Sequence, residues 1–161
     1  MVDKFNKSPT NFVRRRRGLL LAIGAFLSTP LAWATRLFAA RPSEAFRAET
    51  IDETLRSLYG EADILTSDKI RIAAVDLAEN GTVVPLKVEA KLSDVRTISI
   101  IAVENPRPLV GKFVFGEATA GFVATRIKLA KSGDVIAVVE TANGLYQTRK
   151  TIEVTIGGCG V

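Results

Sequence analysis

Apolar and charged residues alternate most clearly between Leu86 and Leu92, where Leu-Lys-Val-Glu-Ala-Lys-Leu brings every second side chain to the same face of a strand. The spacing predicts a half-buried strand with one face in water. Similar β-rich runs, separated by turn residues, follow Thr66, which is typical of a sandwich of antiparallel strands. The predicted strands are Lys69–Val75, Val83–Leu92, Thr97–Val103, Lys112–Phe115, Phe122–Leu129, Val135–Thr141 and Leu145–Ile156.

The run Ile98–Val103 is almost wholly apolar. A strand of this kind belongs at the centre of a sheet or against a second protein, because neither of its faces suits water. Among the predicted breaks, Glu79-Asn80-Gly81 supplies turn residues. Asn143-Gly144 favours a two-residue hairpin turn between the two strands that flank it.

Before the strands, the apolar residues between Glu49 and Tyr59 recur at helical spacing. Thr50 and Glu53 have the spacing of a capping box, and Gly60 supplies a stop. We therefore expect an all-β fold preceded by one short amphipathic helix that packs on the domain or on a partner.

The first 34 residues have the three parts of an export signal. A basic run, Arg14–Arg17, precedes an apolar stretch, Leu19–Leu27, and the small-residue pattern Ala32-Trp33-Ala34 suits cleavage by signal peptidase. The apolar stretch is much shorter than the roughly 20 residues that a permanent membrane helix needs. We therefore expect cleavage after Ala34, no membrane anchor, and a periplasmic protein.

Arg16-Arg17-Gly18-Leu19-Leu20 also resembles the twin-arginine export signature, which implies export of a folded or pre-assembled protein. The expected organisation is a signal peptide at 1–34, a helix and β-sandwich domain at 35–156, and a glycine-rich arm at 157–161.

The formal charge of +5 suggests a nucleic-acid or membrane partner only until the basic residues are located. Six of the 22 basic residues and one of the 17 acidic ones precede residue 35, so 16 of each remain in the domain and arm. Nucleic-acid binding depends on several Lys and Arg side chains neutralising phosphates together. The balance therefore argues against a nucleic-acid partner.

The chain contains no His and one Cys. Nucleophile and imidazole pairs and His/Cys zinc sites cannot form within it. The acidic residues are scattered over the predicted strands and turns, as solvated surface charges are. The sequence predicts no catalytic residue, no metal and no cofactor of its own.

The exception is the C-terminal segment, where Gly157, Gly158 and Gly160 surround Cys159. Glycines give the widest backbone freedom and occupy little space, so we expect a flexible arm that can enter a narrow cleft. The three residues from Gly157 to Cys159 reach about 10 Å when extended. A single cysteine in an exported protein is left free, paired with another chain, or chemically loaded.

The terminal Gly157-Gly158-Cys159-Gly160 resembles the end of the SoxY family, the sulfur carriers of the periplasmic thiosulfate-oxidising Sox system. Ala78-Glu79-Asn80-Gly81, Val84-Pro85 and Phe122–Ala130 are also similar to that family. Val161 departs from it, since the family tail usually ends in two glycines after the cysteine.

The resemblance implies an immunoglobulin-like antiparallel β-sandwich that pairs with a SoxZ-like subunit as a heterodimer. It also implies that sulfur intermediates are attached to Cys159, which makes the chain a carrier and not an enzyme. Its partners would be a haem-containing enzyme that joins thiosulfate to the thiol, a hydrolase that releases sulfate, and a dehydrogenase that oxidises the remaining sulfane sulfur.

Two other functions stay open on the residues alone. The chain could be an exported β-sandwich binding module whose cysteine forms an intermolecular disulfide. It could also be an independent thiol enzyme, although no base or basic group lies near Cys159 in the sequence to generate the thiolate.

Overall fold

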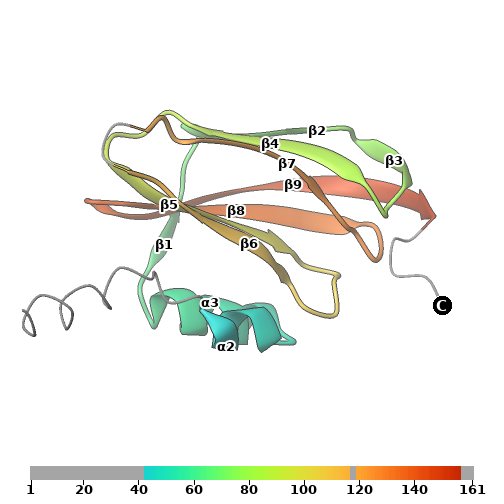
Figure 1. The fold of residues 1–161 in the computed structure, drawn as a ribbon, viewed down its shortest axis with the longest axis horizontal. Helices are drawn as coiled ribbons and strands as arrows, with labels where there is room; N and C mark the ends of the chain where they lie inside the picture. Colours follow the sequence, from blue (N-terminus) through green and yellow to red (C-terminus); the bar gives the residue numbers. More distant parts are fainter. Residues whose placement is uncertain (1–41, 117–118, 157–161) are drawn as a thin grey trace, which may run out of the picture. The chain divides into compact units, whose positions relative to one another are not determined.

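The chain divides into two units, Met1–Arg41 and Pro42–Val161. The computed structural model describes residues 42–116 and 119–156, which form a β-sandwich with two short helices against it (Figure 1). The helices are α2 (Ser43–Arg47) and α3 (Ile51–Tyr59). The strands are β1 (Ile64–Thr66), β2 (Ile70–Ala74), β3 (Leu77–Asn80), β4 (Val84–Ala90), β5 (Val95–Ala102), β6 (Leu109–Val114), β7 (Phe122–Ile127), β8 (Gly133–Thr141) and β9 (Gly144–Ile156).

The larger sheet has the order β1-β9-β8-β5-β6, and β3 also pairs with β9; the smaller sheet has the order β2-β4-β7. The predicted all-β sandwich is confirmed. It differs from the expectation in one respect, because β1 and β3 run parallel to β9 while every other pairing is antiparallel.

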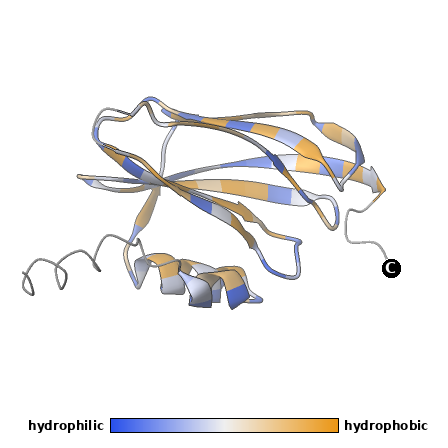
Figure 2. Cartoon of the chain, in the orientation of Figure 1, coloured by the Kyte–Doolittle hydropathy of each residue, from blue (hydrophilic) through white to orange (hydrophobic). Residues whose placement is uncertain are grey.

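The alternation that predicted β4 positions the core of the sandwich. Val84, Leu86, Val88 and Ala90 are buried, and the residues between them are exposed. The same alternation of hydrophobic and hydrophilic residues is visible along the smaller sheet in Figure 2. One face of this sheet therefore packs on the larger sheet, and the other remains outside.

Helices α2 and α3 lie against the outer face of the larger sheet. Ile101 of β5 and Val138 of β8 are fully buried there, in a cluster with Ala45 of α2 and the partly buried Leu55 and Leu58 of α3. Ile98 and Ile100, on the opposite face of β5, lie in the main core. The apolar run Ile98–Val103 thus belongs to a central strand, as the first alternative predicted. The second alternative, that the run contacts another protein, is wrong because the chain's own helices cover it.

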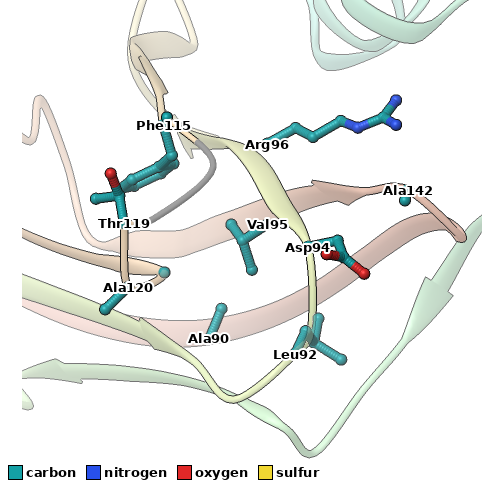
Figure 3. Close-up of a pocket in the computed structure, with 11 residues that line it drawn as sticks. Ala90, Leu92, Asp94, Val95, Arg96, Phe115, Thr119, Ala120 and Ala142 are labelled. Carbon is teal, nitrogen blue, oxygen red and sulfur yellow. The ribbon is translucent and has the colours of Figure 1, made fainter.

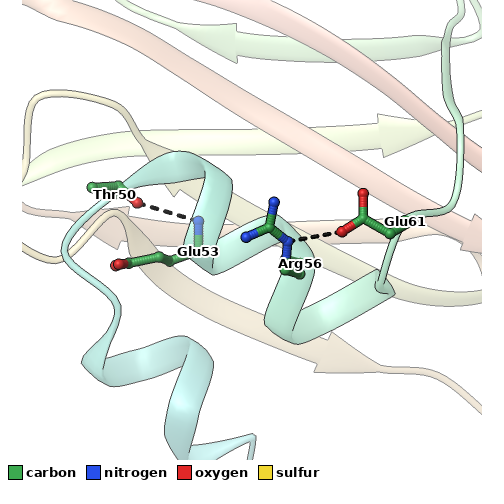
Figure 4. A network of polar contacts seen from close by, with 4 residues as sticks. All are labelled: Thr50, Glu53, Arg56 and Glu61. Carbon is green, nitrogen blue, oxygen red and sulfur yellow. Dashed lines mark hydrogen bonds and ion pairs between the residues drawn. The ribbon is translucent and has the colours of Figure 1, made fainter.

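The start of α3 is fixed by its cap, as predicted (Figure 4). The N–H of Glu53 donates to Thr50 Oγ1 at 3.2 Å. The Glu53 carboxylate accepts from the N–H of Glu49 at 3.2 Å, which is one residue earlier than a full capping box requires. Gly60, with a φ of 68°, ends the helix, and Arg56 forms an exposed ion pair with Glu61 at 2.8 Å.

Other local predictions need correction. Neither α2 nor β1 was expected, and β3 includes Glu79 and Asn80, which were predicted to be part of a turn. The hairpin near Asn143-Gly144 is present, but Thr141 pairs with Gly144, so the turn residues are Ala142 and Asn143. Among the described residues, no helix has the length and apolar character that crossing a bilayer requires.

Candidate functional site

The predicted site residues Gly157, Gly158, Cys159 and Gly160 lie outside the described residues. The nearest described residue is Ile156, the last of β9, whose side chain is 65% exposed. The described part of the candidate site is therefore the end of β9, which we call the arm root and define as Val154–Ile156.

On one edge of β9, the arm root is held by β3 and the turn that follows it. Asn80 pairs with Ile156, and the N–H of Gly81 donates to the Ile156 carbonyl at 2.8 Å. The Gly81 carbonyl accepts in turn from the N–H of Leu129 at 2.8 Å. Two consecutive hydrogen bonds thus connect the last carbonyl of β9, through the turn after β3, to the residues that follow β7.

On the other edge, a side chain continues the ladder where β8 stops. The last register pair between these strands joins Gly133 to Ile152. Two residues farther along β9, the N–H of Val154 donates to Ser132 Oγ at 2.8 Å, and Ser132 Oγ–H donates to the Val154 carbonyl at 3.3 Å. Ser132 therefore serves both backbone groups of a residue that β8 cannot reach.

An ion pair attaches the same stretch of β9 to the connection between β2 and β3. Lys150 Nζ lies 2.6 Å from Asp76 Oδ1, and the hydrogen bond and charge of Lys150 hold the pKa of the Asp76 carboxyl below its usual value. The N–H of Glu153 also donates to the Asp76 carbonyl at 2.8 Å. These contacts hold β9 in place immediately before the arm root.

A second polar cluster lies between α3 and the larger sheet. Tyr59 donates to Ser99 Oγ at 2.7 Å, Thr97 donates to Glu140 at 2.9 Å, and Lys112 Nζ lies 3.6 Å from the same carboxylate oxygen. Burial raises the pKa of Tyr59 to about 12, with a smaller contribution from the charge of Glu140. A phenol that keeps its proton and is hydrogen-bonded in place anchors the helix, and sequence reasoning missed it because the partners are about 40 residues apart.

A pocket of about 640 Å³ lies beside the hairpin between β8 and β9, where Ala142 lines it (Figure 3). Its other lining groups include Asp94, Arg96 and Phe115, and the Arg96 side chain extends away from the other labelled side chains. The 13 residues of β9 separate this end from the arm root by roughly 35–40 Å. The pocket is therefore remote from the arm root.

The described residues contain no group of three or more His, Cys, Asp or Glu side chains that could hold a metal ion. Their acidic side chains are distributed over the surface or serve the contacts above. The chemical candidate that remains is the thiol of Cys159, three residues beyond the arm root.

The family described as "Sulfur oxidation protein SoxY" matches residues 55–159, a match that extends to the cysteine itself. Comparison with curated proteins found no match.

Among solved structures, the sulfur carrier protein SoxY from Chlorobium limicola f thiosulfatophilum is 30% identical, with a TM-score of 0.61, over 66% of this chain and 97% of that one. A superoxide reductase (neelaredoxin) from Ignicoccus hospitalis is 22% identical, with a TM-score of 0.51, over 56% of this chain and 94% of that one. The second likeness shows the shared fold alone.

Proposed function

Because the chain belongs to the SoxY family, we propose that it carries sulfur intermediates covalently on Cys159 during thiosulfate oxidation. The observation that carries the proposal is the family match, which spans most of the sandwich and extends to Cys159. The firmly held arm root supports it, since a fixed strand end gives the residues after it a defined origin.

The chemistry needs only a thiol on this chain. A haem-containing partner would join Cys159 Sγ to the sulfane sulfur of thiosulfate; the thiol proton would leave, and the two electrons would pass to the partner's redox centres. Hydrolysis of the adduct by a second enzyme would release sulfate and leave a persulfide on the cysteine. A dehydrogenase would then oxidise that sulfane sulfur, and the carrier itself would catalyse none of these steps.

Export belongs to the same proposal, because the Sox reactions take place in the periplasm. We expect removal of residues 1–34 and a mature chain that begins near Thr35. Trp33 is the only tryptophan of the chain, so the mature protein should lack tryptophan fluorescence. N-terminal sequencing of periplasmic protein tests this, and a full-length cytoplasmic protein would contradict it.

The decisive experiment replaces the thiol. A Cys159→Ser variant should melt at the parental temperature and still form the heterodimer with a SoxZ-like subunit, yet thiosulfate-dependent electron release in a reconstituted Sox system should fall to background. A Gly158→Phe variant keeps the thiol, and it should slow turnover without abolishing the adduct.

Intact-mass analysis should find reductant-sensitive sulfur adducts on the parent and none on Cys159→Ser. Parental turnover by the Cys159→Ser variant would exclude the carrier function. In that case, the alternative of a binding module with an intermolecular disulfide requires a cysteine-dependent cross-link to a partner chain.

A further inference from the structure

The outer face of the smaller sheet is not covered by any other described element, whereas α2 and α3 cover the larger sheet. Its central row runs from Ala73 through Lys87 to Ala124, and all three residues are exposed. We call this surface the basic face and define it by Arg71, Ala73, Val75, Val83, Pro85, Lys87, Glu89, Phe122, Ala124, Arg126 and Lys128.

The centre of the basic face is shallow and partly apolar. Ala73 and Ala124 are too small to fill the space beside Lys87, and a depression of about 480 Å³ results. Val75 and Pro85 also line it, and Val75 is 49% exposed. A low apolar centre with charged residues around it has the composition of a protein interface.

The charges on this face are unbalanced. Arg71, Lys87, Arg126 and Lys128 are basic, and Glu89 is the one acidic residue of the defined set. Within the described part of the chain, none of the four cations forms an ion pair, whereas Arg56, Arg149 and Lys150 elsewhere each have a carboxylate partner. Since residues 35–161 have equal numbers of acidic and basic side chains, the excess positive charge is local to this face.

We infer that the basic face binds a folded protein partner through an acidic surface of that partner. Unpaired cations around a small apolar centre attract carboxylates and specify their arrangement. A second copy of this chain is disfavoured because two basic faces repel each other. A membrane is disfavoured because the face is a sheet surface with a central depression and presents no amphipathic helix that could insert.

The position of this face connects it with the arm, and to that extent the inference rests on the proposed function. Lys128 precedes Leu129, whose N–H donates to Gly81, and the N–H of Gly81 donates to Ile156 of the arm root. A protein bound on the basic face would therefore lie beside the origin of the arm. The contact itself uses no residue of the arm.

The test uses the full mature chain and four purified probes, namely a SoxZ-like subunit and the three Sox enzymes of the proposed function. Lys87→Glu/Arg126→Glu is titrated against each by calorimetry. Arg47→Glu/Arg107→Glu is the matched control, with the same change of charge at exposed residues of α2 and the β5–β6 loop. Circular dichroism melts establish that both variants fold.

At least one probe should bind the Lys87→Glu/Arg126→Glu variant about tenfold or more weakly, and the control should stay within about twofold of the parent. Added salt should weaken the parent's binding and have less effect on the variant. Equal affinity of the two double variants, or no binding by any probe, overturns the inference. The inference is also overturned if the parent associates with itself and the charge reversal weakens that association. Binding to vesicles of anionic lipid alone, with no binding to any protein probe, overturns it as well.

Cys159→Ser separates this inference from the carrier function. If Cys159→Ser loses turnover while its affinity stays parental and charge reversal weakens binding, both proposals stand. If Cys159→Ser keeps parental turnover and charge reversal still weakens binding, only the carrier function fails.

Discussion

Removing the Ser132 hydroxyl should release the arm root without unfolding the sandwich. Ser132 Oγ accepts from Val154 N–H and donates to the Val154 carbonyl, beyond the last residue of β9 that β8 pairs with. On that edge of β9, nothing else in the described chain is hydrogen-bonded to Val154. A Ser132→Ala variant should therefore loosen the end of β9 at Val154.

The magnitude follows from the geometry of the two bonds. The 2.8 Å bond from Val154 N–H has good length and should contribute about 1 kcal/mol, whereas the 3.3 Å bond from the hydroxyl is long and should contribute less. The total is about 1–1.4 kcal/mol. Because 1.4 kcal/mol corresponds to a factor of ten, local opening at Val154 should become about five to ten times more frequent.

Amide hydrogen exchange measures that opening directly. The protection factor of Val154 should fall about five- to tenfold in Ser132→Ala, while the amide of Val138, at the centre of the larger sheet, should keep its parental protection after correction for global stability. Ser132→Thr keeps the hydroxyl and is the matched control. It should retain most of the protection at Val154.

Two results would refute this reasoning. Unchanged exchange at Val154 in Ser132→Ala would mean that the hydroxyl does not hold the strand end. Equal loss in Ser132→Thr and Ser132→Ala would mean that a hydroxyl at this position does not restore the protection of Val154, and the two hydrogen bonds would not be the cause.

Two other substitutions test the packing. Burial raises the Tyr59 pKa from the ordinary value of 10.0 to about 12. The contribution of the neutral phenol to the stability of the fold is therefore complete below pH 10 and is lost as the pH rises to 12. Over that range, the free energy of unfolding of the parent, measured with urea, should fall by up to about 2–3 kcal/mol more than that of Tyr59→Phe. An identical pH dependence of the two proteins would contradict the assigned burial. Gly121→Ala would bring a Cβ within 2.9 Å of Val95 Cγ2 and should cost about 1–3 kcal/mol in thermal unfolding, whereas Gly116→Ala, with its nearest contact at 3.7 Å, should be close to neutral. Equal melting temperatures of Gly121→Ala and Gly116→Ala would show that the residues around Gly121 shift to accommodate the added Cβ.

The parts of the fold that could be predicted from sequence are those with a long, regular pattern. Alternation is unbroken from Val84 to Ala90, and β4 begins and ends within two residues of the prediction. The helix was predicted from its cap at Thr50 and its stop at Gly60, both of which are local features. In such segments, neighbouring residues contain the whole signal.

Elements that depend on distant partners could not be predicted. β1 has three residues and β3 has four, too few for a period, and each exists because β9 supplies its hydrogen-bond partners. The apolar run Ile98–Val103 left two environments open, since one sequence cannot show that α2 and α3 cover its second face.

The candidate site divides in the same way. Cys159 was found from sequence because one thiol among glycines is unusual by composition alone. The role of Ser132 left no sequence signal, because its partner Val154 is 22 residues away and a serine beside a glycine is typical of any turn.

The position of β9 as the last described strand has a consequence for the order of folding. Its parallel partners β1 and β3 precede it by about 80 residues, so neither can pair until nearly all of the domain has been synthesised. Until β9 has been made, β1 and β3 therefore lack the strand that supplies their hydrogen-bond partners. A chain truncated before β9 should fail to fold, so a folded sandwich implies that synthesis has come within a few residues of the thiol.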